Sequence, residues 1–235
     1  DFAVGRMTQN ADYLASTLNA SLAPSVPALP SQSLDGSTDT YNGNVKVTYT
    51  PMDGLRLNAI YAWDVRDNET AVQAYPVVAT DMLVDPALRS NTPFSLTQNR
   101  FKLNGDYRGP GTWKLSGGID WDNRERTYTE VVNTMETTLW GRASVQALEN
   151  VGLSFNLAHA ERDPSTYGVA YWFPPENPLM RKTNLAARKR DTVGARADWA
   201  ATDKLSLGLG VDYANDDYDE TVIGLNESDT FNVAA

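Results

Sequence analysis

The chain has 235 residues, with 30 Asp or Glu and 20 Lys or Arg, so its formal net charge is −10. This charge argues against a nucleic-acid partner, because phosphate binding needs a basic surface. The lack of cysteine excludes disulfides, thiolate metal sites and haem attachment through Cys-x-x-Cys-His within the chain. No run of 18 apolar residues is present, so no transmembrane helix is predicted. Sequence patterns typical of strands occur at both ends, and we interpret the chain as a piece of a longer protein.

The first 38 residues predict the tail of one strand, at residues 1–7, and then an Ala/Ser/Pro-rich connection at residues 8–38. Within this connection we expect a short helix at residues 11–18. Four β-hairpins follow, in which apolar and polar side chains alternate because successive residues of a strand point to opposite faces. They lie at residues 44–66, 99–122, 139–157 and 193–213. Longer connections separate them, at residues 67–98, 125–136, 163–190 and 215–229, and one more strand starts near Phe231.

Three regularities connect the hairpins. From Val45 onward every apolar row falls on odd residue numbers, so the apolar face is continuous across turns and loops. Tight turns alternate strictly with long connections, which is typical of outer-membrane barrels. Aromatic residues on the apolar rows lie near both strand ends, as expected for two interfacial girdles. These residues are Tyr49, Tyr107, Trp113 and Trp199 near the tight turns and Tyr61, Trp63, Trp121 and Tyr213 toward the long loops.

The fold class predicted by these patterns is all-β, an antiparallel transmembrane β-barrel. A soluble β-sandwich also alternates, but it does not require long loops on one side only or aromatics at both ends of one row. We expect residues 1–235 to be part of a single large barrel domain, with about eight full strands and two partial ones. The long loops at about residues 8–38, 67–98 and 163–190 are expected to be extracellular.

The inward rows carry an excess of positive charge. Twelve basic residues face that way against six acidic ones, which gives about +6. The basic residues are Lys46, Arg56, Arg66, Arg100, Lys102, Arg108, Lys114, Arg124, Arg126, Arg142, Arg162 and Arg196. Among them Lys46, Arg56, Arg100, Lys102, Lys114, Arg142 and Arg196 form the expected basic row of the lumen. This excess suggests anionic contents, although any water-filled barrel carries paired charges.

Catalytic and metal-binding motifs are weak, and we predict a protein that is not an enzyme, with no catalytic residue and no metal. The one histidine, His159, follows the apolar row of its strand, and no Ser or Cys nucleophile accompanies it. Residues 215–220 cluster carboxylates but lack the spacing and central glycine of a calcium loop. We interpret them as a solvated acidic loop, and calcium binding there stays open.

One loop carries a family resemblance. Residues 171–180 are rich in aromatics and proline, and five basic residues follow, namely Arg181, Lys182, Arg188, Lys189 and Arg190. The stretch Asn177-Pro-Leu-Met-Arg-Lys182, with Asn184-Leu-Ala186, Arg188 and Arg190, resembles the outer-membrane barrels associated with decahaem cytochromes, the MtrB/PioB family. Thr183, Ala187 and Lys189 depart from the family pattern, which has an aromatic and two acids there. The motif covers about 14 residues, whereas the alternating pattern of the hairpins covers nearly the whole chain.

The resemblance implies a bacterial outer-membrane barrel that sheathes and positions a multihaem cytochrome for electron transfer across that membrane. The partners it implies are a periplasmic multihaem cytochrome inside the barrel, often a second one on the outer face, and membrane lipid. Haem would be carried by the cytochrome, and none would be bound by this chain. The five basic loop residues are expected to contact the partner at the rim, or else merely to solvate that rim. The alternative function is a general diffusion porin or anion-selective channel.

Overall fold

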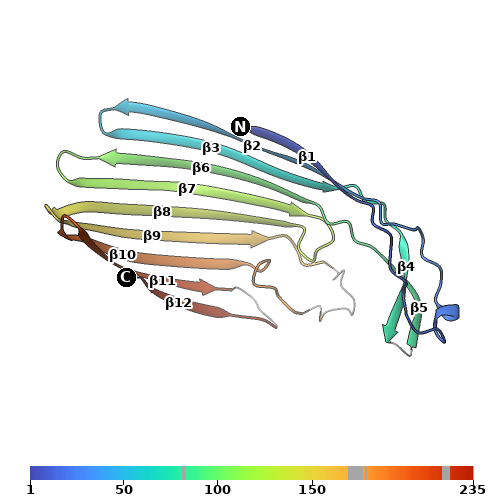
Figure 1. The fold of residues 1–235 in the computed structure, drawn as a ribbon. Coiled ribbons are helices and arrows are strands. Elements are labelled where there is room, and N and C mark those ends of the chain that lie inside the picture. The colour runs from blue at the N-terminus through green and yellow to red at the C-terminus, as the bar shows by residue number, and fades with distance from the viewer. Residues whose placement is uncertain (81–82, 169–176, 178, 219–222, 235) are drawn as a thin grey trace.

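The computed structural model describes residues 1–80, 83–168, 177, 179–218 and 223–234. They form a ten-stranded antiparallel sheet in the order β1-β2-β3-β6-β7-β8-β9-β10-β11-β12, and a separate pair, β4-β5 (Figure 1). The strands are β1 (Phe2–Gln9), β2 (Gly36–Met52), β3 (Leu55–Asn68), β4 (Ala74–Thr80), β5 (Leu83–Ser90), β6 (Leu96–Arg108), β7 (Trp113–Arg126), β8 (Asn133–Leu148), β9 (Val151–Pro164), β10 (Arg188–Thr202), β11 (Leu205–Asp217) and β12 (Glu227–Ala234).

The predicted antiparallel fold is confirmed. Eight strands of 13 to 17 residues are flanked by the eight-residue strands β1 and β12. Within the described part of the chain β1 does not pair with β12, so the sheet is open. Tight turns lie at one end of the sheet, and the long connections with β4 and β5 lie at the other (Figure 1).

The register produces one apolar face and one polar face. From β2 to β12 of the large sheet, odd-numbered residues pair with odd-numbered residues, as in Phe101 opposite Trp121 and Leu115 opposite Ala143, except in the last pair beside three of the tight turns. Even-numbered residues therefore share the other face, where Lys102 lies opposite Asp120. Strand β1 has the opposite parity, because its Phe2 pairs with Gly43. The continuous apolar face predicted from Val45 onward is confirmed.

The large side chains of the apolar face do not form a core within the chain. Val47 and Leu157 are 60% and 64% exposed, as expected for side chains that need lipid as their environment. The most buried apolar side chains instead lie beside or within the loops, and they include Val131, Leu185 and Ala186. Among the described residues, no helix is long and apolar enough to span a membrane.

Aromatic pairs occupy both ends of the apolar face. The rings of Tyr107 and Trp113 meet edge to face at 5.4 Å beside a tight turn. The rings of Tyr61 and Trp63 stack at 5.8 Å toward the long loops. Amphipathic rings at two levels of one apolar face match the interfacial girdles of outer-membrane barrels.

One expectation about the first loop is wrong, and the second connection contains a hairpin that the sequence pattern did not predict. Residues 11–18 form no helix, because the segment pairs with the returning chain: the Tyr13 amide donates to the Gln32 carbonyl at 2.9 Å, and Asp12 bridges to Ser33. The helical turn in this loop is a 3-10 turn at Ala23–Ser25. The connection expected at residues 67–98 is not a plain loop, since it contains the hairpin β4-β5.

The strands also run further than the apolar pattern indicates. Strand β1 reaches Gln9 and β2 begins at Gly36, so the first loop is shorter than residues 8–38. Strand β10 begins at Arg188, inside the loop expected at residues 163–190, and β11 continues to Asp217. Toward the loop ends of the strands both faces of the sheet are polar. The strands therefore continue to pair there although no alternation of apolar and polar residues marks them. Residues 169–176 and 178 of the third loop lie outside the described residues.

The turn between β2 and β3 requires a glycine at position 54. Gly54 has φ of +79°, and a Cβ there would collide with the carbonyl oxygen of Arg108. We expect Gly54→Ala to destabilise the full-length barrel by about 1–2 kcal/mol, since a side chain is strained in this conformation. Gly210→Ala is the matched control, because a Cβ at Gly210 meets no atom within 4 Å. Urea unfolding of the two variants checks this, and equal midpoints would contradict it.

Candidate functional site

The polar face of the sheet carries many charged side chains. Because β8, β10 and β11 run further than predicted, Glu136, Arg188, Arg190 and Asp216 join its even-numbered rows. Counted over the strands from β2 to β12, this face carries fourteen basic and eight acidic side chains, a net charge of +6. The expected positive charge of this face is therefore present, although most of its acids are ion-paired.

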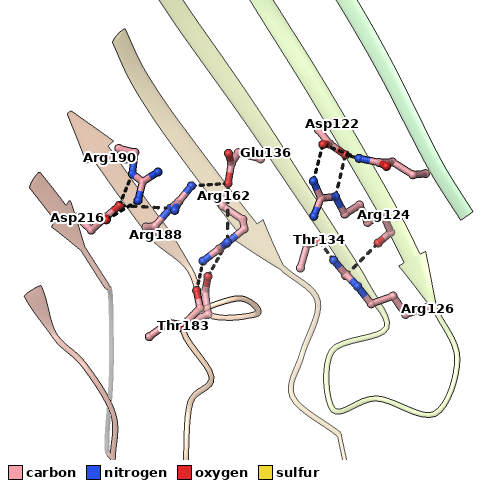
Figure 2. A network of polar contacts seen from close by, with 12 residues as sticks. Asp122, Arg124, Arg126, Thr134, Glu136, Arg162, Thr183, Arg188, Arg190 and Asp216 are labelled. Carbon is pink, nitrogen blue, oxygen red and sulfur yellow. Dashed lines mark hydrogen bonds and ion pairs between the residues drawn. The ribbon is translucent and has the colours of Figure 1, made fainter. Parts of the chain in front are cut away.

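A cluster of arginines and carboxylates lies at the loop end of this face (Figure 2). Arg190 binds Asp216 through two parallel hydrogen bonds of 2.6 Å, from Nε and Nη2. Arg188 donates from Nη2 to Glu136 at 2.9 Å, and its Nε lies 3.6 Å from Asp216. The Asp216 side chain is 6% exposed and that of Arg188 is 12% exposed. Charge-assisted, bidentate pairs of this kind are strong and fix geometry.

Arg162 connects this cluster to the third loop. Its Nε donates to the Ala186 carbonyl at 2.9 Å, and its Nη2 donates to the Thr183 carbonyl (Figure 2). Its Nη1 lies 3.9 Å from Glu136. The same loop segment closes on itself, since the Ala186 amide donates to the Lys182 carbonyl at 2.8 Å. The guanidinium of Arg162 therefore fastens this turn over the end of the polar face.

A second charged group lies on β7 and β8 beside the first. Arg124 binds Asp122 at 2.9 Å, and Arg126 donates to the Thr134 hydroxyl at 2.9 Å (Figure 2). A cavity of about 190 Å³ separates the two groups. Its lining comprises Asp122, Arg124, Arg126, Thr134, Glu136, Arg162, Asn184 and Arg188. Four arginines against two carboxylates leave this cavity positively charged.

The five basic residues predicted as a partner site are distributed over four environments. Arg188 and Arg190 enter the cluster described above. Lys182 extends to another loop, where its Nζ lies 2.7 Å from Glu130, and the Arg181 guanidinium stacks 4.1 Å from the Tyr167 ring centroid. Lys189 has odd parity and lies exposed on the opposite face. These contacts order the loop that carries the motif. Partner binding by the five residues stays a prediction.

Sequence reasoning missed the acidic members of this cluster. Glu136 lies 52 residues from Arg188, and Asp216 lies 26 residues from Arg190. Both were placed in loops, because the apolar row predicted for β8 begins at Leu139, after Glu136, and the row predicted for β11 ends at Tyr213, before Asp216. Their even parity was a usable signal, since it continues the polar row of each strand.

The predicted basic row of the lumen divides into two groups. Lys102, Lys114 and Arg196 are ion-paired, with Asp120 at 3.0 Å, Asp106 at 3.3 Å and Asp198 at 2.7 Å respectively. The other members make no ion pair within 4 Å to any residue that the structure describes. They are Lys46, Arg56, Arg100 and Arg142. Outside the predicted row, Arg108 and Arg126 also make no ion pair to a described residue, and Arg126 instead donates to the Thr134 hydroxyl. The charges of these cations are therefore not neutralised by a carboxylate of the described chain.

His159 is not part of the polar face. It has odd parity, and its Nδ1 lies 2.7 Å from Asp191 and its Nε2 3.4 Å from Glu161. No serine or cysteine nucleophile lies in these contacts. Over the described residues, no three His, Cys, Asp or Glu side chains are grouped to hold a metal ion. The acidic loop considered for calcium includes residues 219–222, which lie outside the described residues.

The Glu130–Lys182 contact has a defined pH dependence. Burial raises the pKa of Glu130, but hydrogen bonds from Lys182, the backbone and Thr129 outweigh it, so the pKa lies below its ordinary value of 4.5. The contact therefore stabilises the loops above that value and is lost as pH falls through the lower folded pKa. We expect Glu130→Gln to cost about 1 kcal/mol at pH 7, and progressively less as the pH falls through the folded pKa of Glu130. Unfolding curves measured over a descending pH series check this, and a pH-independent difference would contradict it.

An antiparallel sheet with one lipid-compatible face, aromatic girdles and a charged opposite face defines a segment of an outer-membrane β-barrel. Comparison with known proteins agrees: the family of outer-membrane beta-barrel porins named MtrB/PioB matches residues 1–235. The chain belongs to the MtrB/PioB family, which is a porin-like and not an enzyme family, and it lies in the bacterial outer membrane.

A curated relative is the Outer membrane protein MtrB of Shewanella baltica (strain OS185). It is 37% identical over 201 residues, which cover 85% of this chain and 29% of the relative. The chain thus spans less than a third of that relative's length. In a barrel of this family the apolar face meets lipid, so the polar face described above lines the interior.

Proposed function

We propose that the full-length barrel sheaths and positions a multihaem cytochrome, through which electrons cross the outer membrane from haem to haem. The barrel supplies position, exclusion of lipid and electrostatics, and the cofactor carries the redox chemistry. The observation that carries this proposal is the net positive charge of the polar face, with basic side chains that have no ion pair within the described chain. Family membership supports the same conclusion.

The chemistry of these basic groups fits an anionic partner surface. Guanidinium groups bind carboxylates and haem propionates through two parallel hydrogen bonds, which lysine and glutamine do not reproduce. Arg100 and Arg142 offer such groups on the polar face. Arg190 joins them, because its side chain stays 41% exposed although it binds Asp216. Arg188 is nearly buried, so we assign it to holding the loop.

The haem in this proposal belongs to the partner. This chain has no cysteine for covalent attachment. Its one histidine lies on the apolar face, engaged with Asp191. A second multihaem cytochrome at the loop end, on the outer face of the membrane, belongs to the same proposal. The long loops are extracellular in this arrangement, since outer-membrane barrels have short periplasmic turns.

Removing unpaired charge from the polar face tests the proposal. In the full-length barrel, Arg100→Gln with Arg142→Gln is expected to leave folding intact and to lower cytochrome retention on affinity purification about tenfold in 0.5 M salt, where the remaining ion pairs are screened. The control is Arg89→Gln with Lys204→Gln, which removes the same charge from a loop hairpin and a tight turn. Full retention by the first double variant would contradict the contact surface.

A general diffusion porin or anion-selective channel is the second candidate, because a positively charged lumen also attracts small anions. Liposome swelling separates the two functions. A barrel filled by a cytochrome is expected to exclude sugars, whereas a porin admits them. Swelling in sugar by the intact complex would favour the channel.

A further inference from the structure

A second charged cavity lies at the opposite end of the polar face, beside the tight turns. It has a volume of about 360 Å³ and lies where β2, β3, β6 and β7 end or begin. Arg56, Arg108 and Lys114 line it, with Asp106 as the acid, and Thr50, Gly54 and Leu55 complete the lining. Three cations against one carboxylate leave the cavity with a net charge of +2.

The acid in this cavity is already engaged. Asp106 accepts a hydrogen bond of 2.6 Å from the Ser116 hydroxyl and lies 3.3 Å from Lys114 Nζ. Arg56 lies opposite Asp106 in the sheet register but makes no ion pair within 4 Å to a described residue. Arg108 likewise has no such partner in the described part of the chain. Two guanidinium groups therefore face one cavity without a bound carboxylate.

The wall of the cavity is fixed by backbone contacts. The Arg108 amide donates to the Gly54 carbonyl at 2.8 Å, which ties the β2-β3 turn to the end of β6. Gly54 makes this approach possible, because a side chain there would collide with the Arg108 carbonyl. The two arginines thus project from positions that the sheet and the turn hold in place.

This cavity is separate from the arginine cluster at the loop end. Between them runs an uncharged row in which Thr48 donates to Asn58 at 2.9 Å and Asn58 donates to Asn104 at 2.9 Å. Gly118 continues this row on β7. The polar face therefore carries two charged regions with a neutral region between them, and each region can be altered alone.

We infer that the cavity at the tight turns is a binding site for an oxyanion, a carboxylate or phosphate group held by Arg56 and Arg108. Planar guanidinium groups match the two oxygens of such a group, and a fixed site loses little freedom on binding. The volume accommodates the group together with several waters, each of which occupies about 30 Å³. This inference does not depend on the cytochrome, because the cavity is formed by this chain alone.

Inorganic phosphate is the probe for the site. Calorimetric titration of the full-length barrel, purified without cytochrome in detergent, is expected to show saturable binding. Arg56→Gln with Arg108→Gln should weaken it about tenfold or more, and Arg56→Lys with Arg108→Lys should weaken it less, since charge is kept while the paired geometry is lost. Arg89→Gln with Lys204→Gln is the charge-matched control and should bind as the wild type does.

The source of the oxyanion follows from repeating the titration on the barrel with its cytochrome. Phosphate binding by both preparations supports a site for a free oxyanion. Binding by the empty barrel only supports a site filled by a carboxylate of the partner. Absence of saturable binding in the empty barrel, or unchanged affinity in the Arg-to-Gln variant, would overturn the inference. The cytochrome-retention experiment with Arg100 and Arg142 is unaffected by either result.

Discussion

Asp216→Asn is expected to lower the stability of the full-length barrel by about 3 kcal/mol. Asp216 is 6% exposed, accepts both hydrogen bonds from Arg190 and lies 3.6 Å from Arg188. An amide keeps the shape but removes the charge, so two guanidinium groups are left crowded at the loop end. The loss is costly because the Arg188 guanidinium, which is 12% exposed, stays desolvated with one carboxylate fewer beside it. Urea unfolding followed by tryptophan fluorescence measures the effect.

The matched control is Asp198→Asn. Asp198 binds Arg196 on the same polar face, but its side chain is 55% exposed. Exposed pairs contribute little because water screens both charges. We therefore expect little change in stability from this substitution. If the two variants unfolded at the same urea concentration, the cluster at the loop end would have no special structural role.

Leu115→Arg is expected to impair insertion and to cost about 1–2 kcal/mol, since it places a charge on the lipid-facing side of β7, next to the interfacial pair of Tyr107 and Trp113. Leu115 is 47% exposed in the chain alone, and its register neighbours Tyr107 and Ala143 share its apolar face. Lipid offers no partner for the guanidinium, so the protein must distort the bilayer or leave the charge desolvated. The fraction of heat-modifiable, inserted barrel measures the effect.

Ser116→Arg provides the comparison at the next residue. Ser116 lies on the polar face, where its hydroxyl donates to Asp106 at 2.6 Å. A guanidinium there can pair with the same carboxylate in the water-filled interior, so the empty barrel should insert normally. Equal tolerance of arginine at positions 115 and 116 would contradict the assignment of the two faces to lipid and lumen.

The fold was predictable because the alternation of apolar and polar residues that defines it can be seen within each short segment of the sequence. Alternation at residues 101–121 assigns both strands of a hairpin, and constant parity joins successive hairpins into one sheet. The extent of each strand was not predictable, since the ladder around Glu136, Arg188 and Asp216 continues where no apolar residue marks it. The hairpin of β4 and β5 was hidden for a related reason: Pro76 and Pro86 favour an irregular connection.

The site was predictable in charge but not in partners. Even parity placed Arg100 and Arg142 on the polar face, and the structure places them there. The same parity did not show that Arg188 meets Glu136 across 52 residues, because that contact requires β8, β9 and β10 to be neighbours at a level beyond the apolar band. Sequence alone therefore did not show that Arg188 orders its loop, and partner binding by the five basic residues stays a prediction.

The most direct test of the central claim is the haem content of the full-length barrel after affinity purification in mild detergent. If the polar face encloses a multihaem cytochrome, haem absorbance will co-elute with the barrel in a constant ratio through a second, size-exclusion step. A colourless barrel, purified at low ionic strength from cells that produce such cytochromes, would contradict the claim.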